Sequence, residues 1–155
     1  MSTFALVCLI LSAILYTLYV SIIYAKYKPS CISESYYKVG YKFTAWILLV
    51  SFLIFPSWVE CSPICFQFLP FLSSIALGVV GLNPKYLGSD RVAHIVATGI
   101  TTVISLIWNI VTGIYTIPIV LLIGVILLWL TKVPNPLFWT ECAAFLNIYL
   151  SILLS

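Results

Sequence analysis

The sequence predicts an all-α fold, a polytopic integral membrane protein with a six-transmembrane-helix bundle and both termini outside. Three observations predict it. The 155 residues are 63% hydrophobic and only 7% charged, with a mean hydropathy of +1.20, whereas a soluble domain usually has about a quarter charged residues. Six apolar segments approach the roughly 20 residues that a helix needs to cross a bilayer. The basic residues lie only in alternate connectors between these segments.

The six predicted spans follow one another in a single transmembrane domain. They cover residues 4–25, 43–59, 66–82, 92–111, 114–130 and 137–154 of the 1–155 domain. The amino end of the first span, MSTF, has no basic residue, and the apolar run is longer than that of a typical signal peptide, so we expect a retained helix. Segments 73–81 and 97–105 are rich in Ser, Thr, Ala and Gly, which favour close helix packing. Pro56, Pro70 and Pro118 are expected to kink their helices or to lie near helix ends.

The distribution of charge predicts the orientation of the spans. All seven basic residues lie in the connectors after the first, third and fifth spans: Lys26, Lys28, Lys38, Lys42, Lys85, Arg91 and Lys132. Because basic residues are retained in the cytoplasm, these connectors are predicted to face it. The tryptophans fit the same topology, with Trp46, Trp129 and Trp139 near the cytoplasmic interface and Trp58 and Trp108 near the outer one. We expect a multi-pass protein of the bacterial inner (plasma) membrane.

Composition also limits the partners and cofactors. No basic and aromatic patch indicates nucleic acid, so the expected partner is the lipid bilayer, and a homo-oligomer or a membrane protein partner is left open. The single histidine and the cysteine spacing do not form a zinc pattern, so we expect no metal and no cofactor. Cys61 and Cys65, in CSPIC on the predicted outer side, could form a disulfide. The simpler interpretation is that they are two small apolar residues of a loop.

The stretch GSDRVAHIVATG holds the only histidine of the chain, at the start of the fourth predicted span. Asp90 and His94 are four residues apart and share one helix face. Ser89 or Asp90 could cap this helix, and Asp90 could orient the neutral ring of His94. A simpler interpretation is that Asp90 is only a helix cap and His94 only an interface residue.

Glu141 is the second candidate, about one turn into the sixth span from the same side. Acids inside a membrane cost about 2.5–3.5 kcal/mol, so they normally face the bundle interior and are paired. We expect Glu141 to pair with His94 if the fourth and sixth spans pack together. Glu34, a candidate ligand-binding residue, could fold over the same face from the long connector, whereas Glu60 lies at the opposite surface. Alternatively, Glu141 is simply hydrated at a helix start.

Three short motifs carry a resemblance to known proteins. They are PSCISESYY in the first connector, GLNP in the middle of the chain and DRVAHIVATGI at the start of the fourth span. Together they resemble small six-helix bacterial membrane proteins of the Frag/DRAM-like and related unknown-function type. The resemblance covers the middle of the chain, implies the six-helix fold and implies no mechanism.

The scarcity of polar residues favours a non-enzymatic accessory, assembly or regulatory role. A small transporter or channel subunit is an alternative, although the fifth span has almost no polar residue beyond Thr116. An intramembrane lipid-directed hydrolase using Asp90, His94 and Glu141 is less favoured. One histidine is too few for a ceramidase-type metal site, and a set of Ser89, His94 and Glu141 has no nucleophile motif around it.

Overall fold

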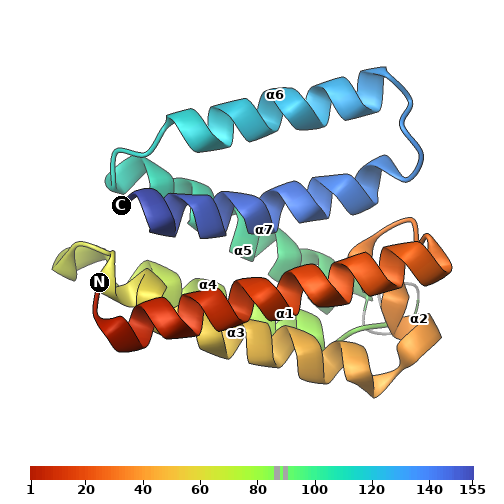
Figure 1. The fold of residues 1–155 in the computed structure, drawn as a ribbon, viewed down its shortest axis with the longest axis horizontal. Coiled ribbons are helices and arrows are strands. Elements are labelled where there is room, and N and C mark those ends of the chain that lie inside the picture. The colour runs from red at the N-terminus through yellow and green to blue at the C-terminus, as the bar shows by residue number, and fades with distance from the viewer. Residues whose placement is uncertain (86–87, 89–90) are drawn as a thin grey trace.

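The fold is a bundle of antiparallel helices, given by a computed structural model that describes residues 1–85, 88 and 91–155. All regular structure within these residues is helical, as predicted. The elements in chain order are α1 (Thr3–Tyr27), η1 (Ile32–Ser35), α2 (Tyr36–Val39), α3 (Tyr41–Glu60), η2 (Ile64–Phe66), α4 (Phe68–Leu82), α5 (Arg91–Val111), α6 (Thr116–Leu130) and α7 (Pro136–Leu154). The long helices alternate in direction, so both termini lie at one end of the bundle (Figure 1).

The alternation of the helices gathers the basic residues at the other end. This end, called the basic end below, holds connector 28–40, the end of α4, the start of α5 and the connector between α6 and α7. The opposite end, called the termini end, holds Ser2, Glu60 and η2. There Glu60 accepts hydrogen bonds from the backbone N–H of Ser2 at 2.6 Å and from its hydroxyl at 2.7 Å. These bonds join the start of α1 to the end of α3.

Five helical segments are long and apolar enough to cross a membrane, by length and composition: Thr3–Tyr27, Tyr41–Glu60, Ile64–Leu82, Arg91–Val111 and Pro136–Leu154. The remaining long helix, α6, is strongly apolar but has only 15 residues. Such a helix rises about 22 Å, which is less than the roughly 30 Å of a bilayer's hydrocarbon core. Five helical segments therefore meet the length and composition that a membrane span requires, and α6 falls short of that length.

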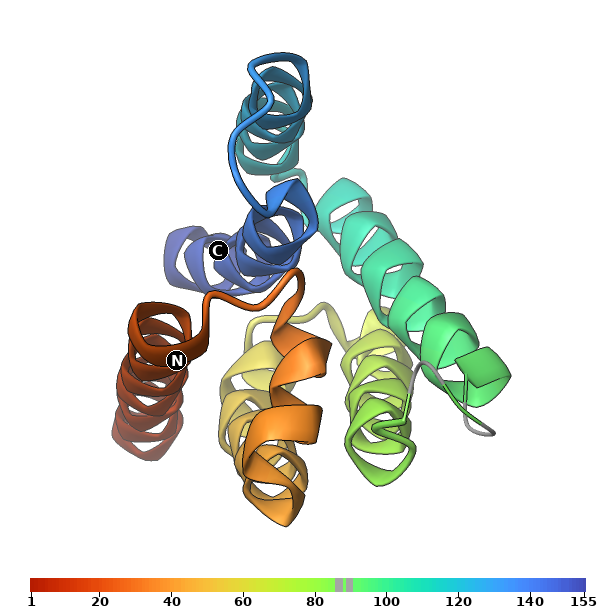
Figure 2. The same cartoon turned by 90° about the vertical axis from the view of Figure 1, so that its right-hand side faces the viewer.

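The helices form a curved row with two helices on its concave side. Helices α1, α3, α4 and α5 make the row, and the most extensive contacts are between neighbours within it. Helix α7 lies in the concave side, and α6 lies beyond α7 (Figure 2). Apart from Ile117, the side chains of α6 are at least partly exposed. In a membrane, this surface of α6 would face lipid.

The core is rich in aromatic rings. Tyr16 of α1 stacks on Phe145 of α7, with ring centroids 4.7 Å apart. Trp58 and Trp108 are almost completely buried, and their rings meet edge-on with centroids 6.0 Å apart. Both tryptophans lie toward the termini end, and their side chains are buried between the helices. Burial is tolerated for Trp108 because its indole N–H donates to the Ser62 hydroxyl at 2.7 Å.

Small residues permit the close approach of α3 and α4. At Gly81, an added Cβ would lie 2.3 Å from Cγ2 of Ile47, so only glycine fits without movement of Ile47. Pro56 lies inside α3, whereas Pro70 and Pro118 lie in the first turns of α4 and α6. Backbone N–H groups of a first turn have no partner within the helix, so proline is tolerated there.

Candidate functional site

The connector after α1 folds back over the basic end of the bundle. Lys28 ends α1 in a left-handed conformation, with φ of 45°. Residues 31–35, called the roof segment below, include four buried residues: Cys31, Ile32, Ser33 and Ser35. The Ser35 hydroxyl bonds to the Tyr19 hydroxyl at 2.7 Å, and the Asn135 side chain donates to the carbonyl of Lys28 at 3.0 Å. The roof segment is thus attached to α1, and the connector is attached to the start of α7.

Glu141 holds the roof segment from α7. One oxygen of its carboxylate, Oε2, accepts a hydrogen bond from the backbone N–H of Ile32 at 2.5 Å. The backbone N–H of Ser33 also bonds to this carboxylate. Both N–H groups belong to the start of η1, where backbone donors have no partner within the helix. The carboxylate is therefore matched by two donors that the roof segment would otherwise leave unpaired.

His94 holds the roof segment from α5. The ring is buried, with Nδ1 2.9 Å from the carbonyl oxygen of Asn83 and Nε2 3.0 Å from the hydroxyl of Ser33. A carbonyl oxygen only accepts, so Nδ1 carries the proton in this bond. In the neutral ring, Nε2 then accepts the hydrogen bond that the Ser33 hydroxyl donates. The carbonyl of Asn83 thereby fixes the tautomer of His94.

His94 and Glu141 line one open cavity of about 390 Å³ at the basic end. This basic-end pocket is lined by Cys31, Ser33, Arg91, His94, Ile95, Thr98, Leu137 and Glu141. The two predicted partners come together, but direct packing of their helices is not what joins them, since α5 and α7 contact each other sparsely. Instead, adjacent residues of the roof segment bond to both: Ile32 to Glu141 and Ser33 to His94.

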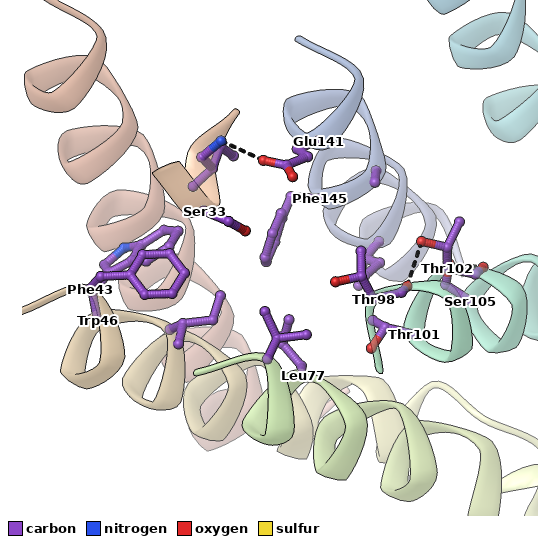
Figure 3. Close-up of a pocket in the computed structure, with 15 residues that line it drawn as sticks. Ser33, Phe43, Trp46, Leu77, Thr98, Thr101, Thr102, Ser105, Glu141 and Phe145 are labelled. Carbon is purple, nitrogen blue, oxygen red and sulfur yellow. Dashed lines mark hydrogen bonds between the residues drawn. The ribbon is translucent and has the colours of Figure 1, made fainter. Parts of the chain in front are cut away.

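A smaller cavity of about 60 Å³ lies deeper in the bundle (Figure 3). Ser33, Thr98 and Glu141 line both cavities, so the two adjoin. One wall of the inner cavity carries hydroxyl groups of α5, from Thr98, Thr101, Thr102 and Ser105, and the facing wall includes Leu77 and Phe145. Each of these four hydroxyls donates to a carbonyl of its own helix, so toward the cavity it can only accept.

The other predicted residues lie elsewhere. Ser89 and Asp90 fall outside the described residues. Glu34 accepts a hydrogen bond from the backbone N–H of Ser30 at 2.5 Å within the connector, and it lines neither cavity. Among the described residues, no cluster of three or more His, Cys, Asp or Glu side chains could hold a metal ion. Cys61 and Cys65 lie at the termini end as free thiols, and their disulfide stays a prediction.

Sequence reasoning missed four groups of this site: the Ser33 hydroxyl, the Ile32 and Ser33 N–H groups and the Asn83 carbonyl. Three of them are backbone groups, so no residue type marks them. The only available signal for Ser33 was its place in PSCISESYY, where apolar Cys31 and Ile32 interrupt an otherwise polar connector.

Comparisons with known protein families, curated proteins and solved structures find no match to this chain. The resemblance to Frag/DRAM-like membrane proteins therefore rests on its short motifs and stays a prediction.

Proposed function

We propose that this chain is a six-span membrane protein that binds an anionic amphiphile in the basic-end pocket, in an accessory or regulatory role. Five apolar helices of sufficient length support insertion in a membrane. The gathering of all seven basic residues at one end supports a cytoplasmic position for that end. We also propose that this membrane is the bacterial inner (plasma) membrane. The charge pattern and the resemblance of the short motifs to small bacterial membrane proteins support this location.

The lining of the basic-end pocket is the observation that carries the proposal. Ile95 and Leu137 provide apolar walls and are 52% and 44% exposed. Ser33 and His94 provide polar groups deeper in, and Arg91 provides an exposed cation at the rim. A molecule with an apolar chain and an anionic head fits this lining, with the chain against Ile95 and Leu137 and the head near Arg91.

The sparse contact between α5 and α7 supports entry from the bilayer. A transporter or channel formed by a single chain is less well supported, because a path through the bundle would have to pass the termini end. There the buried rings of Trp58 and Trp108 pack against each other.

Photolabelling with a diazirine-bearing palmitic acid tests the binding. In nanodiscs, we expect adducts concentrated on peptides that contain Ile95 and Leu137. Leu137→Trp fills the pocket and should abolish this labelling, whereas Leu146→Trp is the matched control because Leu146 lies on the same helix with the same 44% exposure. Arg91→Gln should weaken labelling by the fatty acid more than labelling by a neutral diazirine alcohol. Equal labelling in the two tryptophan variants would contradict the proposal.

Cysteine accessibility tests the topology separately. The five native cysteines are first replaced by alanine or serine. Lys38→Cys, at the basic end, should react with an impermeant maleimide only after the cells are opened. Ile64→Cys, which replaces an 89% exposed residue at the termini end, should react in intact cells. The reverse pattern would reject the orientation and leave the pocket unaffected.

A further inference from the structure

We propose that Ser33 is a nucleophile, activated by His94, that takes the acyl group of an amphiphilic carboxylic ester held in the basic-end pocket. The proposal rests on the amphiphile binding proposed above and goes beyond it, since it gives the pocket a reaction. It also differs from the set of Ser89, His94 and Glu141 considered from the sequence. Here the hydroxyl is that of Ser33 in the roof segment, and the backbone carbonyl of Asn83 has the place of the acid in a catalytic triad.

The geometry of Ser33 and His94 is that of a nucleophile and its base. The Ser33 hydroxyl lies 3.0 Å from Nε2 of His94, within the roughly 2.6–3.2 Å reach of proton transfer. The Asn83 carbonyl, 2.9 Å from Nδ1, keeps the proton on that nitrogen. In serine hydrolases an aspartate has this orienting role. Here Nε2 is left with its lone pair toward Ser33, which a general base requires.

The roof segment also provides two donors for an oxyanion. The backbone N–H groups of Ile32 and Ser33 both bond to the carboxyl group of Glu141. Paired backbone N–H groups, including that of the nucleophile itself, stabilise the negative oxygen that develops during acyl transfer. Glu141 thus places a carboxyl oxygen at the donors that the oxyanion would use. In this proposal the carbonyl oxygen of the bound ester replaces the Glu141 oxygen at these donors.

The reaction needs only the ester and water. The oxygen of Ser33 attacks the ester carbonyl carbon while its proton moves to Nε2 of His94, and the carbonyl π electrons move to the oxygen held by the two N–H groups. Collapse of this intermediate breaks the bond to the alcohol, which leaves with the proton from Nε2, and an acyl-Ser33 ester remains. Water then attacks that ester, with His94 taking its proton and returning it to the Ser33 oxygen. The products are a carboxylic acid and an alcohol.

A long-chain alkyl fluorophosphonate tests the nucleophile directly. An activated serine displaces its fluoride much faster than an ordinary serine hydroxyl does, and the adduct is located by peptide mass spectrometry of the intact chain in nanodiscs. We expect one adduct, on Ser33, that is absent in Ser33→Ala. Ser30→Ala is the matched control, because Ser30 is an exposed serine of the same connector and has no histidine partner among its described bonds. It should label like the wild type. His94→Gln should slow labelling by at least about 100-fold.

The outcomes separate the two proposals. An unlabelled Ser33 in a protein that still binds the diazirine fatty acid overturns the nucleophile and leaves the binding proposal standing. Labelling of Ser33 at an unchanged rate in His94→Gln also overturns it, because the base is then irrelevant. Leu137→Trp gives a second variant that leaves the Ser33 and His94 side chains unchanged in sequence, and it should slow labelling by blocking the pocket. Labelling at the wild-type rate in that variant would contradict the proposed path of the ester.

Discussion

Removing the carboxylate of Glu141 should loosen the roof segment without weakening the helix bundle. In Glu141→Leu, the backbone N–H groups of Ile32 and Ser33 lose their acceptor, although both residues are buried, with 4% and 7% exposure. Leucine at this position is also favourable for a membrane segment, since a buried acid is costly there. The two effects have opposite signs and act at different places, so they can be measured apart.

The magnitude follows from the two unpaired donors. A buried donor left without a partner costs about 1–3 kcal/mol, so two such donors cost about 2–6 kcal/mol. The roof segment can avoid this cost by opening to water, and the lost stability therefore appears as easier local opening. Since each 1.4 kcal/mol is tenfold in an equilibrium constant, hydrogen exchange of the Ile32 amide should rise by about 30-fold or more.

Hydrogen exchange with mass spectrometry in nanodiscs gives the measurement. Glu141→Gln is the matched control, because its amide oxygen still accepts from Ile32, and its increase in exchange should be several times smaller. Amides in the middle of α3 should exchange as in the wild type in both variants. A rise of less than about threefold at Ile32 in Glu141→Leu would refute the reasoning, since it would mean that the carboxylate does not hold the roof segment closed.

Three further predictions concern packing and need thermal unfolding in detergent. Gly81→Ala should lower the free energy of unfolding by about 1–3 kcal/mol, because the new Cβ would overlap Ile47, whereas Gly99→Ala, with nothing within 4 Å, should not destabilise. Trp108→Phe should cost about 1 kcal/mol through loss of its bond to Ser62, and Trp129→Phe, at an exposed residue, should cost less. Asn147→Leu removes the 2.9 Å hydrogen bond from Asn109 and should lower the free energy of unfolding by about 0.6–1.7 kcal/mol. The double variant with Asn109→Leu should recover part of that loss. Additive losses in the double variant would contradict a direct coupling of the two side chains.

The helices could be predicted from the sequence because each one is marked by a long run of apolar residues and not by any single residue. Apolar runs of the required length leave the backbone no alternative to internal hydrogen bonds in lipid, and helices occupy all six runs. The shared depth of His94 and Glu141 followed from the same counting along the spans. Both residues lie near the starts of their helices, α5 and α7. Short connectors make successive helices antiparallel, so these two starts lie at the same end of the bundle, where one cavity can include both residues.

The roof segment could not be predicted because its bonds depend on backbone groups. The acceptor for His94 is the carbonyl of Asn83, and the donors for Glu141 are the N–H groups of Ile32 and Ser33. No side chain distinguishes these residues from their neighbours. Trp108 shows a related limit: the preference of an indole ring for an interface assumes that its N–H needs water, but the Ser62 hydroxyl accepts from the N–H of Trp108 inside the protein.

The position of the site at a bundle end has a physical reason. Inside a membrane helix the backbone donors are already used by carbonyls of the same helix, so a neighbouring helix has few N–H groups to offer to a carboxylate. A chain reversal supplies such groups, since the first residues of η1 have unpaired N–H groups. Glu141 and His94 lie one or two turns from the ends of their helices, where connector 28–40 can reach both. A polar site built on backbone donors is thus expected where a connector folds inward, and in this chain the roof segment is the buried connector that meets both α5 and α7.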